Sequence, residues 1–273
     1  MKPILIGAQG FFEKEGESIY FESYGEGETI VLCHGKGGNH AIWFQQVPIL
    51  AQHYHVVTWD QRGFGRSSNR ANMAGPQAAA EDLQALLDHL KVDQAHLVGQ
   101  SMGGWAVLES TLRWPERTQT LILADTLAGL STPEIAAEYE MSRAKRYAKP
   151  AATHLSMDGH AIITADSAEQ NMIRAFLYNQ IGRSNGLPPA DAGQLIQRKT
   201  YDPEQIQAMK TPTLFIVGEK DSIFPPAMIR QAAALVPNSQ VVEIREADHS
   251  PYFETPEQWN ETVINFIKSQ KPG

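Results

Sequence analysis

A serine between two glycines is the first feature of this 273-residue sequence that suggests chemistry. Residues 99–103 read Gly-Gln-Ser-Met-Gly and fit G-x-S-x-G, in which a tight turn between a strand and a helix presents a nucleophilic serine. Residues 182–186 fit the same pattern around Ser184. Ser101 follows an apolar run and precedes a helical pattern, whereas Ser184 follows a helical pattern and precedes two prolines, which cannot continue a helix. The context predicts Ser101 as the nucleophile and Ser184 as a loop residue.

A serine hydroxyl needs a base to become nucleophilic, and the base needs an acid to orient it. His249 fits the base because it lies in a loop after the last β-rich run. Asp221 fits the acid because it follows the β-rich run before that one. Asp125, which also follows a predicted strand, is the alternative acid. Asp248 is expected on the surface, because the side chains of sequence neighbours diverge.

A glycine-rich loop at residues 34–39, His-Gly-Lys-Gly-Gly-Asn, follows another predicted strand. Acyl transfer develops negative charge on an oxygen atom, which two aimed N–H groups must stabilise. We expect these donors to be the amides of Met102 and Lys36, with Gly37 as the alternative to Lys36.

Other uses of these residues are less well supported by the sequence. The phosphate-loop pattern G-x-x-x-x-G-K-[S/T] is absent. His34 and His40 could ligate a metal, but no third ligand occurs at a suitable spacing, so we expect neither a metal nor a cofactor. Residues 59–67 lack the third glycine of a dinucleotide-binding motif and are interpreted as a structural loop organised by Asp60 and Arg62.

Short β-rich runs alternate with longer helical patterns along the chain, which predicts a mostly parallel α/β sheet. Strands are expected at residues 18–24, 29–33, 55–59, 95–98, 120–124, 213–217 and 240–244, and helices at 78–90, 105–113 and 256–268. Residues 127–210 break the alternation, with helices expected at 134–147 and 169–181. We therefore predict a core formed by residues 1–126 and 211–273 and a helical cap formed by residues 127–210.

Composition excludes several classes of protein. Hydrophobic residues make up 42% and charged residues 20% of the chain, which is typical of a globular protein. The net charge of −8 disfavours binding to nucleic acid or to an anionic membrane. No apolar run is long enough for a membrane span, and the single cysteine, Cys33, forbids an internal disulfide. We expect a cytoplasmic protein whose partner is a small-molecule substrate. The sequence leaves open whether the protein forms a homodimer.

Four landmarks together resemble the α/β-hydrolase superfamily: His34-Gly35, residues 60–67, the turn at Ser101, and the pair Asp221 and His249. The order Ser101, Asp221, His249 is the chain order of that superfamily's triad. The resemblance spans residues 18–267 and implies an α/β-hydrolase fold with a cap like those of esterases, lactonases and carbon–carbon hydrolases. Epoxide hydrolases and haloalkane dehalogenases carry aspartate at the position of Ser101.

These inferences predict a serine hydrolase that cleaves a small carboxylic ester or lactone through an acyl-enzyme. The alternatives are a hydrolase of carbon–carbon bonds in β-diketone-like ring-cleavage products and a ligand-binding protein that lacks catalysis. Candidate substrate-binding residues are Gly37, Trp43, Met141 and Phe176, with core or cap packing as the alternative role of the last three.

Overall fold

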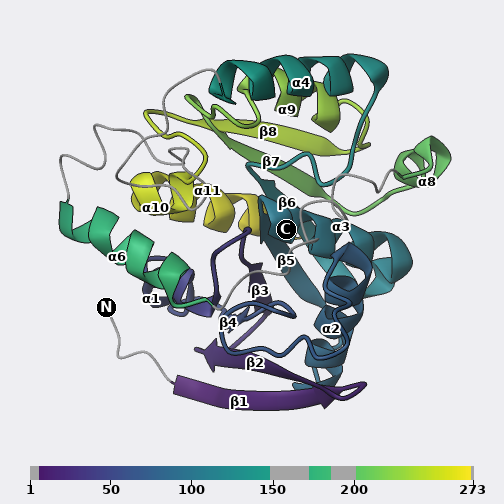
Figure 1. Ribbon diagram of the computed structural model, residues 1–273. Coiled ribbons are helices and arrows are strands. Elements are labelled where there is room, and N and C mark those ends of the chain that lie inside the picture. Colours follow the sequence, from purple (N-terminus) through teal and green to yellow (C-terminus); the bar gives the residue numbers. More distant parts are fainter. Residues whose placement is uncertain (1–5, 148–171, 186–200, 272–273) are drawn as a thin grey trace.

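A computed structural model describes residues 6–147, 172–185 and 201–271. Its centre is an eight-stranded sheet in the order β1-β2-β4-β3-β5-β6-β7-β8 (Figure 1). β1 pairs antiparallel with β2 and β2 with β4, and all further neighbours pair in parallel. The strands are β1 (Ile6–Lys14), β2 (Glu17–Tyr24), β3 (Thr29–Cys33), β4 (His55–Trp59), β5 (Ala95–Gln100), β6 (Thr118–Ala124), β7 (Thr213–Gly218) and β8 (Ser239–Ile244).

Helices cover both faces of the sheet, and each face has its own core. One core joins the sheet to α2 (Pro76–His89), α3 (Met102–Arg113) and α9 (Pro226–Ala233). The other joins it to α1 (Val47–Leu50) and α11 (Pro256–Ser269). Because both faces are covered, β3, β5 and β7 are buried along their whole length, as their apolar sequences require.

Several short helices lie in the connections between these elements. They are η1 (His40–Trp43), η2 (Pro115–Arg117), α8 (Pro203–Gln207) and α10 (Pro251–Glu254). No helix within residues 6–147, 172–185 and 201–271 is long and apolar enough to cross a membrane.

The expected strands and the α/β architecture are confirmed, with two differences in detail. Strand β1 was not expected from the sequence, and α3 begins directly after Ser101 rather than at Trp105. Gly103 and Gly104 are weak helix formers, which hid this start. A Cβ on Gly104 would lie 2.3 Å from Thr126 Cγ2, so close packing against the loop after β6 requires this glycine.

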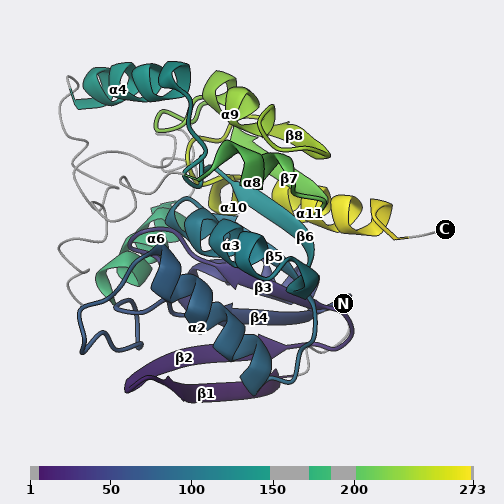
Figure 2. The same cartoon turned by 90° about the vertical axis from the view of Figure 1, so that its right-hand side faces the viewer.

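The predicted cap contains two long described helices, α4 (Pro133–Tyr147) and α6 (Met172–Arg183). Figure 2 shows both helices at the same end of the molecule, opposite the C-terminus. Residues 148–171 and 186–200 lie outside the described residues, as does the expected start of the second cap helix at Glu169. Ile206 of α8 and the nearby Met209 belong to the core on the α2 and α3 face. The cap boundary at residue 210 therefore stays a prediction.

The strand order brings the predicted site together at one edge of the sheet. The carboxyl ends of parallel strands meet at this edge, where open α/β sheets bind ligands. Ser101 follows β5, Asp125 follows β6, Asp221 follows β7 and His249 lies beyond β8, while residues 34–39 follow β3.

Candidate active site

Ser101 lies in the tight turn between β5 and α3, in a backbone conformation that residues with a side chain rarely adopt. Its φ is 48° and its ψ is −115°. A Cβ on Gly99 would lie 2.4 Å from Gly103 O, and one on Gly103 would lie 2.2 Å from Cys33 O. Both flanking glycines are therefore required by backbone contacts. Together they permit the strained turn that presents the serine at the edge of the sheet.

The structure brings Ser101, His249 and Asp221 into one hydrogen-bonded chain. Ser101 Oγ and His249 Nε2 are 3.0 Å apart, and His249 Nδ1 and Asp221 Oδ2 are also 3.0 Å apart. With Nδ1–H donating to the carboxylate, Nε2 is left to accept the serine proton. His249 and Asp221 are buried, so their contact is shielded from water, whereas the contact with Ser101 is partly buried. The catalytic roles of the three residues stay predictions, and this arrangement is the geometry that they require.

The acid is fixed by its own loop. The amides of Ile223 and Phe224 donate to Asp221 Oδ1 over 2.7 and 2.9 Å. Asp248 is half-buried rather than on the surface, because its Oδ1 accepts the Ser222 amide at 2.9 Å and thereby caps the same loop. Burial and the nearby charge of Asp221 raise the pKa of Asp248.

Two further contacts position the imidazole. Gln100 Nε2 donates to the backbone oxygen of His249 over 3.0 Å. The Phe224 ring lies 5.7 Å from the imidazole, and it also stacks on Tyr139 of α4 at 5.8 Å. The first cap helix therefore packs against the acid loop.

The glycine-rich loop lies directly beside the nucleophile. A Cβ on Gly35 would lie 2.1 Å from Gln100 Oε1 and 3.2 Å from Ser101 Cβ, so only glycine fits there. Gly38 N donates to Gly35 O at 3.0 Å, which makes Lys36 and Gly37 the central residues of a turn, with a φ of 79° at Gly37. Met102 begins α3, and the first amides of a helix have no acceptor within it. The loop and the helix start thus lie where the two predicted oxyanion donors would be needed.

His34 holds this loop in place rather than binding a metal. Its Nδ1–H donates to Gly35 O over 2.8 Å, and its Nε2 accepts the Gln61 amide at 3.0 Å. This pattern requires the neutral imidazole, in agreement with the burial that lowers the pKa of His34. Asp60 organises the neighbouring loop as predicted, since its Oδ2 accepts the Arg66 amide at 2.8 Å. Arg62 forms a buried ion pair with Asp82 of α2.

The end of α6, which contains the second G-x-S-x-G match, is bonded to the glycine-rich loop. Asn185 Nδ2 donates to Gly37 O over 2.6 Å and to Gly38 O over 3.1 Å, and Gly65 N donates to Asn185 Oδ1 over 2.8 Å. Asn39 Nδ2 donates to Ser184 Oγ over 3.0 Å. Ser184 ends a helix and does not follow a strand, as its predicted role as a loop residue requires. Sequence reasoning missed Asn39 and Asn185, although Asn39 ends the glycine-rich loop.

The other predicted substrate-binding residues have varied surroundings. Trp43 is fully buried, with its ring 4.9 Å from Tyr252 and 5.8 Å from Trp259, so it packs in a core. Met141 on α4 and Phe176 on α6 are exposed among the described residues. Their substrate-binding roles stay predictions, because the segments between the cap helices lie outside the described residues.

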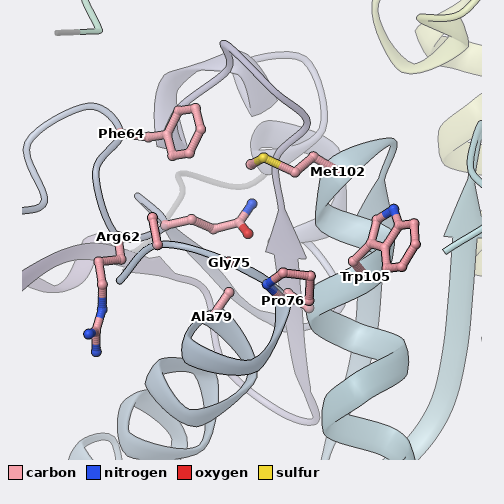
Figure 3. A pocket seen from close by; sticks show the side chains of 10 residues that line it. Arg62, Phe64, Gly75, Pro76, Ala79, Met102 and Trp105 are labelled. Carbon is pink, nitrogen blue, oxygen red and sulfur yellow. The ribbon is translucent and has the colours of Figure 1, made fainter. Parts of the chain in front are cut away.

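A narrow cavity lies beside the start of α3, behind the side chain of Met102 (Figure 3). Phe64 and Arg62 border it on one side, Pro76 of α2 lies below, and Trp105 closes it on the α3 side (Figure 3). The space open to the centre of a water molecule is about 20 Å³. This volume holds one or two waters and is too small for an acyl chain, so we do not assign it as the substrate pocket.

Among the described residues, one group of side chains has the donor atoms for a metal ion, namely Asp125, Asp221 and His249 within 4.8 Å of one another. Asp221 and His249 already use these atoms in the contacts with each other and with Ser101. We therefore assign Asp221 and His249 to the predicted triad, with Asp125 beside it.

Known proteins resemble this chain in sequence and in fold. Residues 28–256 match the family model of the alpha/beta hydrolase fold. The chain is 28% identical to the pimeloyl-(acyl-carrier protein) methyl ester esterase of Aeromonas hydrophila, over 92% of this chain and 99% of that protein. It is 27% identical to the 2-hydroxy-6-oxononadienedioate/2-hydroxy-6-oxononatrienedioate hydrolase of Escherichia coli, over 91% of this chain and 90% of that protein.

A solved structure agrees with these matches. The thermophilic esterase of Thermogutta terrifontis superposes with a TM-score of 0.80 at 26% identity, covering 99% of this chain and 100% of the esterase. The family match extends from β3 to the start of α11 and includes the turn at Ser101, the acid loop and His249. The chain therefore belongs to the alpha/beta hydrolase fold family.

Proposed function

We propose that this protein is a serine hydrolase that cleaves small carboxylic esters or lactones through an acyl-enzyme on Ser101. The observation that carries the proposal is the contact of 3.0 Å between Ser101 Oγ and His249 Nε2, with the buried Asp221 on the other imidazole nitrogen. A hydroxyl, an imidazole and a carboxylate in this order form the constellation that activates serine for acyl transfer.

The mechanism follows from these contacts. His249 Nε2 takes the proton of Ser101 as Oγ attacks the carbonyl carbon, while Asp221 stabilises the imidazolium. The amides of Met102 and Lys36 bind the oxygen that becomes negative. The imidazolium then gives its proton to the leaving alcohol, and water, deprotonated by His249, releases the acid and restores the serine.

The relatives support hydrolysis in general and differ in the bond that they cleave. The Aeromonas relative is named as a methyl ester esterase, and the solved structure is of an esterase. The Escherichia coli relative, named as a hydrolase of a 2-hydroxy-6-oxo dienedioate, supports cleavage of a carbon–carbon bond as the second candidate. A panel of short p-nitrophenyl esters, lactones and ring-cleavage products, assayed side by side, separates the two candidates.

The two serines of the repeated motif provide a matched test. We expect Ser101→Ala to lower kcat for p-nitrophenyl butyrate by about 10⁴-fold or more, because no other described hydroxyl contacts the imidazole. Ser184→Ala changes the motif at the end of α6 and should keep most of the activity.

A fluorophosphonate probe should label the wild type and the Ser184→Ala protein but not the Ser101→Ala protein. Full ester hydrolysis by Ser101→Ala would disprove the mechanism. A wild type that hydrolyses no member of the panel and is not labelled would favour a ligand-binding protein.

A further inference from the structure

Asp125 is a fully buried carboxyl group beside the triad that the mechanism above does not use. It follows β6 with a φ of 51°, and its amide donates to Ile216 O of β7 over 2.8 Å. Its Oδ1 accepts the amide of Gly218 at 2.9 Å. These contacts fix the side chain between the ends of two strands, next to the acid loop.

The second oxygen of Asp125 requires an explanation. Asp125 Oδ2 is buried and meets no hydrogen-bond donor within the described residues. The carboxyl group of Asp125 lies close to the carboxylate of Asp221, since one oxygen or nitrogen atom of each of Asp125, Asp221 and His249 lies within 4.8 Å of the others. Two ionised carboxylates at this distance repel each other, and a buried pair of this kind retains a proton.

The surrounding donors decide which carboxyl group keeps the proton. Asp221 receives two backbone amides and the His249 Nδ1–H, all of which favour its ionised form. Asp125 receives a single amide, from Gly218. Burial, followed by the negative charge of Asp221, raises the pKa of Asp125 well above its ordinary value. The proton therefore belongs on Asp125.

We propose that Asp125 is a neutral carboxylic acid whose O–H donates a hydrogen bond to Asp221, and that this bond makes Asp125 a positioning residue for the triad. The proton gives Oδ2 a partner and leaves a single negative charge beside His249. Asp125 thus supports the triad acid and does not replace it. The positioning role rests on the proposed function, whereas the location of the proton does not.

The groups around Asp125 are compatible with a neutral acid. The side chains that interact with it electrostatically are Asp221, His249, Glu254, Tyr178 and Tyr252. Asp221 and His249 are paired with each other, and Glu254 accepts the amide of Asp248. The two tyrosines are neutral at ordinary pH because burial raises the pKa of each. None of the five is a lysine or an arginine that would favour a second carboxylate.

The location of the proton can be tested by unfolding, without any substrate. In the unfolded chain Asp125 ionises near its ordinary pKa of about 3.9, whereas in the folded protein it stays protonated at higher pH. Between these two pKa values the folded state therefore binds one more proton than the unfolded chain. In this range, the contribution of Asp125 to wild-type stability falls as pH rises. Asp125→Asn keeps both hydrogen bonds and carries no titrating group, so it lacks this fall.

We compare the Tm of Asp125→Asn with that of the wild type at each pH and expect the difference to grow in favour of the variant between pH 5 and pH 8. The growth should be up to about 3–6 °C per pH unit, over the range in which Asp125 is protonated in the folded protein and ionised in the unfolded chain. A Tm difference that does not change with pH would mean that Asp125 is already ionised, and it would overturn the proposal.

The positioning role is tested by kinetics with three variants. Asp125→Asn should keep kcat within about threefold of the wild type and leave the acidic limb of the kcat/KM profile in place, because its amide replaces the O–H donor. Asp125→Ala should lower kcat roughly 10-fold to 100-fold and move the acidic limb to higher pH, because Asp221 loses a donor and holds the imidazolium more strongly. Asp221→Asn should lose about 10⁴-fold.

Either of two results would overturn the positioning role. A loss in Asp125→Asn as large as that in Asp221→Asn would make Asp125 the charged acid, and full activity in Asp125→Ala would leave it without a role. If Asp125→Ala fails to fold, the Asn variant and its unfolding profile still decide the proposal. If the wild type hydrolyses none of the substrates, unfolding still locates the proton, so failure of the proposed function remains distinguishable.

Discussion

The two aspartates nearest to His249 in the loops after β7 and β8 have different tasks. Asp221 Oδ2 meets the imidazole, whereas Asp248 Oδ1 meets the Ser222 amide. Sequence proximity therefore does not identify the acid. The neighbour of His249 in the chain bonds to Ser222, and the residue 28 positions earlier contacts the imidazole.

This difference gives a matched pair of variants at the scale of single residues. Asp221→Asn should lower kcat by about 10⁴-fold, because an amide favours the wrong imidazole tautomer. Asp248→Asn keeps an oxygen that accepts the Ser222 amide and should stay within about threefold of the wild type. Steady-state ester hydrolysis measures both. An equal loss in the two variants would show that the acid has been assigned wrongly.

Among the elements, the two described helices of the predicted cap contact loops of the candidate site. α4 contacts the acid loop, where Ser142 Oγ donates to Ser222 O over 3.1 Å. α6 contacts the histidine loop through Tyr178 Oη and Ser250 Oγ, 3.0 Å apart. It contacts the glycine-rich loop where Asn39 Nδ2 donates to Ile181 O over 3.2 Å, and Asn185, just beyond the helix, adds a second contact. The described cap helices therefore touch three loops that carry the predicted catalytic groups.

The contact of Asn185 with the glycine-rich loop predicts an effect on catalysis from the cap. Asn185→Ala should lower kcat roughly 10-fold to 100-fold, because a shift of the loop misplaces the Lys36 amide. Gln180→Ala is the control, since Gln180 is an exposed residue of α6, close to Asn185 in the chain. Kinetics should be compared with Tm. An Asn185→Ala protein with unchanged kcat would mean that the loop keeps its position without the cap.

In the molecule as a whole, core residues pack on both faces of the sheet, and a buried ion pair joins one of the flanking helices to a loop near the site. Arg62 Nε and Nη2 donate to both Asp82 oxygens over 3.0 and 2.6 Å, with both side chains buried. The pair joins the loop after β4 to α2. Breaking such a pair leaves an uncompensated buried charge, which is far more costly than losing an exposed pair.

Neighbouring residues on α2 provide the comparison. Asp82→Ala should reduce the free energy of unfolding by about 3–5 kcal/mol, because Arg62 stays buried without its partner. Glu81→Ala removes a half-exposed pair with Arg113 and should cost less than about 1 kcal/mol. Urea denaturation monitored by circular dichroism measures both values. Similar losses in the two variants would contradict the importance of burial.

The α/β class, the turn at Ser101 and the choice of Asp221 and His249 as candidates could all be predicted from the sequence. These features are local: apolar runs bury strands, and glycines on both sides of a serine permit one strained turn. The start of α3 and the strand β1 were missed, because their local sequences have weak helix or strand signals.

How residues far apart in the chain meet became visible in the folded molecule alone. It places Asp125 within 4.8 Å of Asp221 and bonds Asn185 to the glycine-rich loop. It also places Trp43 in a core, where the sequence left two roles open. The reason is physical: these contacts depend on strand order and helix packing, which are set by the sum of many small burial energies along the whole chain.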